Sequence, residues 1–247
     1  MKFNVVSKEM ERALQTVLMK GKYKSGSMLK TKIIGEYAFL SLTNNVLTIY
    51  NANNCCGCCI NIIVEEPDSQ NGGGTFVVEI EKMIKYLKSF TDIVNVSITD
   101  FILLKSGSKR ASLPLVIDHP AINMVHKVIN TEITEDFPFF GKTKLESNIT
   151  VLGDNLIDAV NACSVVGTGE YKLDYDGEEL HISSNYNQES YKTVVPMIAH
   201  IGEPSTLVIA QPFHKFVNGL TILYMKDDAP LLMKGIDRKI VLAPRVE

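Results

Sequence analysis

The sequence predicts an α+β protein made of two similar domains. A phrase in residues 103–114 recurs in the closing segment 228–247, and the order strand, helix, strands, helix, strands can be read twice along the chain. The matched residues, each pair 128 positions apart, are Leu103 with Leu231, Gly107 with Gly235, and Arg110 with Arg238. Because this spacing is close to half of the 247 residues, the chain is interpreted as one folding unit written twice.

The first half begins with an expected strand over residues 2–6 and a helix over 8–19, for which Ser7 is a plausible N-cap. Met10, Leu14 and Val17 recur at helical spacing and form the apolar stripe of that helix. The remaining expected elements are strands over 46–54 and 60–64, a helix over 80–90, and a hairpin over 103–114.

The second half repeats this order, beginning with a strand over 148–152 and a helix over 154–163. Pro212 suits the first turn of a further helix over 211–218. The remaining expected elements are strands over 179–187 and 191–196, and a closing hairpin with its turn at 235–238.

The expected domain boundaries follow from this repeat. Residues 1–117 form the first domain, 118–141 a connector, and 142–247 the second domain. The connector is longer than an ordinary loop, and long loops of this kind are usually functional or disordered. It carries several apolar side chains, so we expect it to lie against a surface.

Composition and charge restrict the classes of protein. The chain is 45% apolar with a formal net charge of −3, and no apolar run approaches the roughly 20 residues that span a bilayer. The first residues lack the apolar core of a signal peptide, so an intracellular location is expected. An acidic net charge disfavours a basic nucleic-acid binder as a whole but leaves room for one basic surface.

Four of the five cysteines lie together as Cys55, Cys56, Cys58 and Cys59. The Cys-x-x-Cys spacing is compatible with zinc or redox chemistry. Neighbouring side chains of a strand point to opposite faces, and no second pair of ligands is evident, so a structural role as small apolar residues is favoured. No cofactor or metal is expected.

The C-terminal residues carry a resemblance to a known family. Ala229-Pro230-Leu231 together with residues 241–247 resembles the C-terminus of sliding clamps of the proliferating cell nuclear antigen (PCNA) type. Residues 1–113 look like a domain of a bacterial β clamp, and 135–138 resemble the entry to its following domain. The resemblance implies two processivity-fold domains per chain, with inner helices, four per chain, and outer β-sheets. It also implies assembly into a six-domain ring, as a homotrimer or as a heterotrimer of related chains.

The function implied by the resemblance is that of a DNA polymerase processivity factor. Such a ring encircles double-stranded DNA without reading its sequence, and it tethers DNA polymerase and other replication and repair proteins. The implied partners are duplex DNA, a clamp loader, further copies of the chain, and proteins that carry clamp-binding peptides, with no membrane partner. The implied location is the cytoplasm and nucleoid of a prokaryote or a virus-infected cell, or the nucleus of a eukaryote.

The resemblance gives the cations of the predicted helices a role, because phosphate contacts position a protein on DNA without specifying sequence. The third helix departs from the family pattern, since its polar side shows Asp154, Asp158 and Asn161 and no Lys or Arg. Either Lys142 and Lys144 compensate, or the second domain grips DNA weakly. The expected DNA-binding residues are Lys8, Arg12, Lys20, Lys82, Lys85, Lys88 and Lys215.

The second implied site is a pocket for the hydrophobic anchors of partner peptides, beside the C-terminal tail and beneath the connector. Residues 241–244 could instead be a plain edge strand that Pro244 blocks from further pairing. An exposed apolar groove usually marks a binding site, which favours the pocket. Its expected residues are Tyr50, Asn54, Val128, Ile129, Pro230, Val241, Leu242, Ala243 and Pro244.

An enzyme is the main rival class, but the residues do not favour it. The glycine-rich stretches at 71–74 and 167–169 lack the Gly-Lys-Ser/Thr of a phosphate-binding loop, and the five histidines are scattered. The alternative to a replication clamp is a non-enzymatic peptide-binding scaffold, such as a checkpoint-type clamp or a viral accessory factor. A thiol or metal protein built on the cysteine cluster is a distant third.

Overall fold

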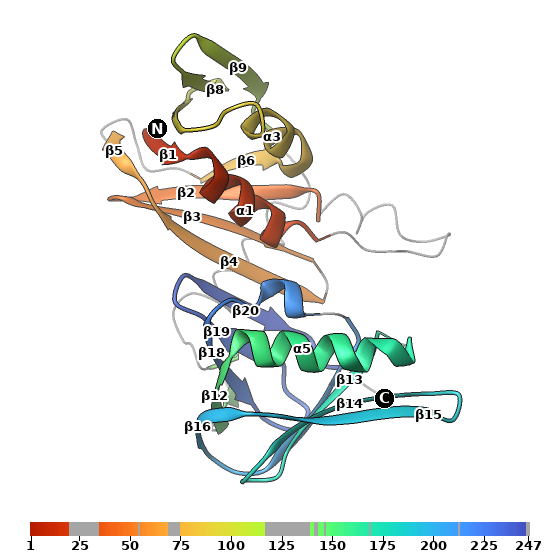
Figure 1. Ribbon diagram of the computed structural model, residues 1–247. Coiled ribbons are helices and arrows are strands. Elements are labelled where there is room, and N and C mark those ends of the chain that lie inside the picture. Colours follow the sequence, from red (N-terminus) through yellow and green to blue (C-terminus); the bar gives the residue numbers. More distant parts are fainter. Residues whose placement is uncertain are drawn as a thin grey trace. The chain divides into compact units, whose positions relative to one another are not determined.

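A computed structural model of the chain describes residues 1–19, 35–53, 55–68, 75–116, 139–140, 143–145, 147–167, 169–211 and 213–245. The chain divides into two compact units (Figure 1). The first contains Met1–Asn53 and Cys58–Ile129, and the second contains Asn54–Gly57 and Asn130–Glu247. Most of the predicted connector, 118–141, lies outside the described residues.

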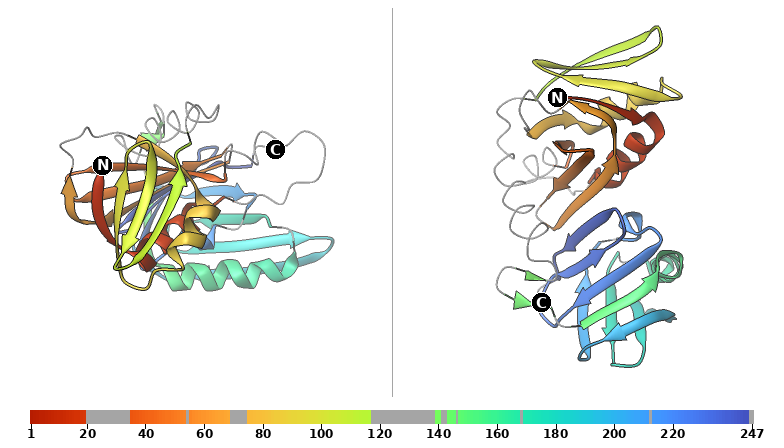
Figure 2. Two further views of the ribbon diagram at one scale, coloured as in Figure 1. Left: turned by 90° about the horizontal axis from the view of Figure 1, so that it is seen from above. Right: turned by 90° about the vertical axis from the view of Figure 1, so that its left-hand side faces the viewer.

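The described residues of the first unit form two sheets and the α-helices α1 (Ser7–Val17) and α3 (Ile80–Leu87). The strand orders are β5-β1-β7-β8-β9 and β4-β3-β2-β6. Figure 2 shows the hairpin of β8 and β9, coloured yellow to green, which continues the sheet of β1 and β7. The strands are β1 (Lys2–Val6), β2 (Tyr37–Thr43), β3 (Val46–Ala52), β4 (Cys56–Ile63), β5 (Glu65–Asp68), β6 (Thr75–Glu79), β7 (Ile93–Ile98), β8 (Phe101–Ser106) and β9 (Lys109–Pro114).

The helices of this unit form because each has one apolar stripe at helical spacing. In α1 the stripe is Met10, Ala13, Leu14 and Val17, all buried, and α1 packs against α3. The prediction of Ser7 as an N-cap was wrong. Ser7 is the first helical residue, and its hydroxyl donates a hydrogen bond to the Leu87 carbonyl (2.7 Å) at the end of α3 instead of accepting one from an amide of its own helix. This side chain thus ties the two helices together.

The second unit has the same plan, and its described residues include the α-helix α5 (Gly153–Cys163), followed by the 3-10 turn η2 (Ser164–Val166). A second 3-10 turn, η3, covers His214–Phe216. The strand orders are β16-β12-β18-β19-β20 and β15-β14-β13-β17, with a separate pair β10-β11. The strands are β10 (Phe139–Phe140), β11 (Thr143–Lys144), β12 (Ser147–Leu152), β13 (Tyr171–Tyr175), β14 (Leu180–Tyr186), β15 (Glu189–Val195), β16 (Met197–Ile201), β17 (Ser205–Ile209), β18 (Leu220–Met225), β19 (Leu231–Lys234) and β20 (Arg238–Leu242).

The predicted internal repeat is confirmed by strand order. In the five-stranded orders β5 corresponds to β16, and each order ends in the closing hairpin of its unit. In the four-stranded orders β4-β3-β2-β6 corresponds to β15-β14-β13-β17. The start of the first helix is also repeated. The Ser7 amide donates to the Asp92 carbonyl (3.1 Å), and the Gly153 amide donates to the Gly219 carbonyl (2.7 Å). A Cβ on Gly153 would meet that Gly219 oxygen at 2.8 Å, so this helix must begin with glycine.

The predicted fourth helix, over 211–218, was wrong. Among the described residues of that segment the structure has only the turn η3, and Val217 is already extended. Three large side chains of this short stretch, Phe213, Phe216 and Val217, are buried in close succession. These residues are three and four positions apart, which is the spacing of one helical face, so the apolar pattern alone does not distinguish this 3-10 turn from a longer helix.

The two closing hairpins share their place in the fold but not their register. In the first, Ser106 pairs with Lys109, which leaves a two-residue turn at Gly107 with φ of 56°. In the second, Lys234 pairs with Lys239, so the turn holds two more residues. Gly107 and Gly235, which match in sequence, therefore occupy turns of different length. A Cβ on Gly235 would lie 3.0 Å from the Arg238 side chain.

The cysteine cluster lies in and before β4. Cys56, Cys58 and Cys59 are buried and Cys55 is exposed. Burial raises the pKa of the Cys56 thiol to about 12. Within the part of the chain that the structure describes, no group of three or more His, Cys, Asp or Glu side chains is placed to hold a metal ion. No helix among the same residues is long and apolar enough to cross a membrane.

Candidate DNA-contacting and peptide-binding sites

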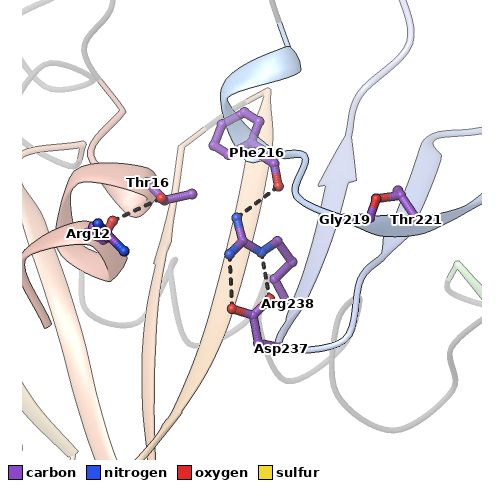
Figure 3. Close-up of polar contacts among 7 residues, drawn as sticks. All are labelled: Arg12, Thr16, Phe216, Gly219, Thr221, Asp237 and Arg238. Carbon is purple, nitrogen blue, oxygen red and sulfur yellow. Dashed lines mark hydrogen bonds and ion pairs between the residues drawn. The ribbon is translucent and has the colours of Figure 1, made fainter. Parts of the chain in front are cut away.

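The helices of the first unit expose three cations that have no ion pair with a described residue. Lys8 and Arg12 lie on the exposed face of α1, opposite its buried stripe, and Lys85 lies on the exposed face of α3. Figure 3 shows Arg12, whose backbone carbonyl accepts a hydrogen bond from the Thr16 hydroxyl (2.9 Å). That bond is to the backbone, so the guanidinium remains available for an anion.

The other predicted cations of this face are partly neutralised. Lys82 Nζ lies 3.8 Å from Glu79 Oε2, and Lys88 Nζ lies 3.9 Å from Glu11 Oε1. Lys88 follows the last residue of α3, so its ion pair joins the end of α3 to α1. Exposed pairs at such distances contribute little to stability, and a phosphate can compete for the lysine.

The helix of the second unit carries the opposite charge. Its exposed side chains include Asp154, Asp158 and Asn161, and no Lys or Arg occurs in Gly153–Cys163. Lys215 belongs to the turn η3, and its Nζ lies 4.6 Å from the centroid of the Phe216 ring, a cation–π distance. Burial and the neighbouring Lys215 charge lower the pKa of His214.

A buried arginine fixes η3 in place. The Arg238 side chain is 11% exposed, and its Nε and Nη2 donate to the two carboxylate oxygens of Asp237 at 2.7 and 2.9 Å (Figure 3). Its Nη1 donates to the Phe216 carbonyl at 3.4 Å. The hydrogen bonds from Arg238 hold the pKa of the Asp237 carboxyl below its usual range. The side chain thus connects the closing hairpin to the turn that stands where the first unit has α3.

The C-terminal strand ends beside the cysteine segment. Val241 and Leu242 are buried in the core, Ala243 is exposed, and Pro244 is half-buried. The Ala243 amide donates to the Cys55 carbonyl (2.9 Å), which also accepts from the side-chain amide of Gln211 (3.2 Å). Hydrogen bonding thus fixes the Ala243 backbone, while the Ala243 side chain is exposed and Pro244 is half-buried.

Comparisons with solved structures cover the whole chain. A structure of A. fulgidus PCNA with the C-terminal region of FEN-1 bound matches with a TM-score of 0.72 at 15% identity, over 100% of this chain and 98% of that one. The DNA polymerase III β subunit of Thermotoga maritima matches with a TM-score of 0.73 at 12% identity, over 100% of this chain. The Helicobacter pylori β clamp bound to a DNA ligase peptide matches with a TM-score of 0.69 at 13% identity, over 99% of this chain.

This chain has the sliding-clamp fold. It spans nearly the full length of the archaeal PCNA but only 65% and 66% of the two bacterial chains. No protein-family model matches the sequence, and a comparison with curated proteins found no match. The likeness is therefore one of fold, and it confirms the prediction of two similar clamp domains of α+β class.

Of the predicted peptide-binding residues, the described part of the chain includes Tyr50, Pro230 and residues 241–244. Pro230 is buried at the start of β19, so like Val241 and Leu242 it belongs to the core of the second unit. Tyr50 lies in the first unit, buried in β3 and stacked on Phe39 with ring centroids 5.2 Å apart; burial raises its pKa. The predictions for Lys20, Asn54, Val128 and Ile129 fall outside the described residues. The site assignments as a whole stay predictions.

One pocket on this chain was not predicted. It has a volume of about 380 Å³ and lies on the second unit, where the C-terminal tail passes β17. Strand alternation places Lys172 on the solvent side of β13, which is the signal that could have indicated a polar face. The lining residues are Glu170, Lys172, Ser183, Ser184, Asn185, Val208 and Arg245.

Proposed function

We propose that this protein is a DNA sliding clamp that encircles duplex DNA as a trimeric ring and tethers DNA polymerase and other replication and repair proteins. The observation that carries the proposal is the two-domain clamp fold over the entire chain, which matches 98% of an archaeal PCNA. Three chains of two units each supply the six domains of such a ring. The protein acts as a scaffold and catalyses no reaction itself.

The exposed cations of the first unit support the DNA part of this proposal. A ring that slides must attract phosphates without holding bases, and Lys8, Arg12 and Lys85 are exposed and unpaired with any described acid. Lys82, Lys88 and Lys215 add weaker attraction, because each already has a neighbour of its own. The contacts are therefore electrostatic and independent of sequence.

The accessible residues that follow β20 support the proposed binding of partner peptides. Both A. fulgidus PCNA and the H. pylori β clamp were solved with peptides from other proteins bound. In this chain Ala243 and Pro244 present accessible apolar surface directly after β20. We propose that these residues contact the hydrophobic anchors of partner peptides, while Pro230, Val241 and Leu242 shape the site from within the core.

Encirclement can be tested without a loader. The protein is incubated with linear duplex DNA whose ends are open, the ends are then blocked with streptavidin, and the complex is washed in about 0.5 M salt, at which surface electrostatics are screened within a few ångströms. We expect retention on blocked DNA and loss from unblocked DNA. Equal loss from both would contradict a closed ring around the duplex.

The stoichiometry has its own measurement. Sedimentation or mass photometry of the purified protein should give three times the 27.4 kDa chain mass. A protein that stays a monomer at micromolar concentration and shows no retention on blocked DNA would contradict the clamp proposal.

The acidic face of α5 favours one alternative, a peptide-binding scaffold that does not hold DNA. Asp154 and Asp158 repel phosphates, and the α5 segment has no cation to offset them. The two candidates differ in the retention experiment. A scaffold of this kind binds the partner peptide but gives no retention on end-blocked duplex.

A further inference from the structure

The pocket on the second unit is crossed by a row of cations. Strand register places Lys172 of β13 directly beside Ser183 of β14 and beside Val208 of β17. Ser183 in turn pairs with Lys192 on β15. On the other side the Arg245 amide donates to the Val208 carbonyl at 2.8 Å, so the C-terminal tail is hydrogen-bonded to β17 at the edge of this sheet.

These cations are mostly free to meet a ligand. Lys172 and Lys192 form no ion pair with any residue that the structure describes, and both are exposed. Arg245 pairs with Glu170, and both side chains are more than a third exposed, so the pair is solvated and open to exchange. Three positive charges against one negative charge give the row an excess of positive charge. The Ser183 hydroxyl and the Asn185 amide add hydrogen-bond donors to the same region.

We propose that this pocket, with the Lys192 position beside it, binds an acidic segment that flanks the clamp-binding peptide of a partner protein. The inference rests on the proposed function, because it takes the partner peptide to lie along Ala243 and Pro244. Arg245 is the next residue, so a peptide that leaves this strand end meets the cation row directly. The carboxylates of the acidic segment pair with Lys172 and Lys192. A further carboxylate replaces Glu170 as the partner of Arg245.

The geometry suits an extended chain. Lys172 and Lys192 stand two strands apart, roughly 10 Å between backbones, and alternate side chains of an extended peptide are separated by about 7 Å. The lysine side chains are long enough to make up the difference between these two spacings. Acidic residues at alternate positions of the peptide can therefore reach both Lys172 and Lys192. Each exposed pair is weak, and the acidic flank is therefore expected to tighten binding by roughly fivefold at low salt.

The test compares a parent peptide with acid-extended versions of it on three forms of the full-length protein. The probes are the C-terminal peptide of the host's DNA polymerase and the same peptide with Asp-Glu-Asp-Glu added at either end. The proteins are the wild type, the double variant Lys172→Glu/Lys192→Glu, and the control double variant Lys144→Glu/Lys234→Glu, which changes the net charge equally at exposed positions of the same unit. Fluorescence anisotropy at about 50 mM and about 500 mM salt gives the affinities.

We expect the wild type and the control to bind one acid-extended peptide roughly fivefold more tightly than the parent at low salt, with the difference gone at high salt. The Lys172→Glu/Lys192→Glu protein should bind the parent peptide normally and lose this preference. Equal affinities of the wild type for all peptides would overturn the inference while leaving the proposed function intact. Failure of the wild type to bind any of the peptides overturns both.

A nucleic acid is the other anionic polymer that a cation row attracts. A single-stranded oligonucleotide is therefore added as a third probe. Binding of the oligonucleotide that is lost in Lys172→Glu/Lys192→Glu, together with equal peptide affinities, would assign the pocket to nucleic acid and overturn the inference.

Discussion

In the first unit α1 and α3 expose Lys8, Arg12 and Lys85, whereas in the second unit α5 exposes Asp154 and Asp158 at the corresponding place in the fold. Both units bury an apolar stripe beneath these faces. The fold therefore requires the stripe and leaves the exposed face free to vary in charge. If the protein is the DNA-encircling ring proposed above, its phosphate contacts are concentrated in the first unit of each chain.

The second helical position differs in another way. In the first unit α3 buries Ile80, Met83, Ile84 and Leu87, while in the second unit the turn η3 buries Phe213 and Phe216. The second unit thus uses large aromatic side chains at the position where the first unit has the longer helix α3. Arg238 donates to the Phe216 carbonyl of the turn, and the exposed Arg110 of the first hairpin makes no such contact with a described residue.

Charge reversal on the first unit should give the largest effect. In the triple variant Lys8→Glu/Arg12→Glu/Lys85→Glu, we expect duplex affinity at about 50 mM salt to fall roughly 100-fold, because each lost phosphate contact also removes about 0.9 from the salt slope. The comparison variant on α5 is Asn155→Glu/Asn161→Glu, which changes the net charge by −2 where the triple variant changes it by −6, and we expect it to lower the affinity by less than about threefold. Equal losses from both variants, measured by anisotropy with a labelled duplex, would contradict the division of labour between units.

The two arginines of the hairpins should differ in their effect on stability. Arg238→Ala removes three charged hydrogen bonds from a largely buried side chain, and we expect the free energy of unfolding to fall by about 2 kcal/mol. Arg110→Ala, at the matched and exposed position, should change it by less than about 0.5 kcal/mol. Urea denaturation of both variants measures the difference. A similar small loss from each would show that Arg238 does not hold the turn.

The pH dependence of that loss follows from Asp237. Its folded pKa is lowered by Arg238, so its contribution to stability is present above the unfolded pKa of about 3.9 and is lost as the pH falls through the lower folded value. The gap between wild type and Arg238→Ala should therefore be largest near neutral pH and shrink below about pH 4. A gap that does not change between pH 7 and pH 3 would argue against this ion pair as the cause.

The sequence predicted the repeat because apolar periodicity and the hairpin phrase are local signals. Strand 2–6, helix 154–163 and both closing hairpins lie where they were expected, to within a residue or two. The prediction of a fourth helix was wrong although Pro212 fits a helix start. Packing of Phe213, Phe216 and Val217 in the tertiary core determines the conformation of this segment, and the local sequence does not show that packing. The register difference between the hairpins was likewise invisible in a pattern of matched residues.

The candidate sites were predictable to a different degree. The charges of the exposed helix faces follow from periodicity alone, so the contrast between α1 and α5 was expected. Burial of Val241 and Leu242 depends on which side of β20 faces the core, and the cation row depends on the registers of β13, β14, β15 and β17. These registers join residues distant in the sequence, and no local pattern specifies them.

The ends of the two hairpins allow a comparison of peptide binding. Pro244→Asp places a charge beside the proposed contact at Ala243, and we expect affinity for a polymerase C-terminal peptide to fall about tenfold through the desolvation cost of the carboxylate. Pro114→Asp, at the exposed end of the first hairpin, should leave that affinity unchanged. Comparable losses from both, in a peptide anisotropy assay, would remove the C-terminal strand end from the binding site.

The smallest expected effect distinguishes two lysines of one helix. Lys85 has no acidic partner among the described residues, whereas Lys82 lies 3.8 Å from Glu79 and is partly neutralised. Lys85→Gln should lower duplex affinity roughly twofold at about 50 mM salt, and Lys82→Gln should lower it less. Glu79→Gln supplies the complementary change, since it releases Lys82 and should raise the affinity slightly. If Lys82→Gln costs more than Lys85→Gln, then Lys82 leaves Glu79 when DNA binds, and the contact set of the first unit is wider than the three unpaired cations.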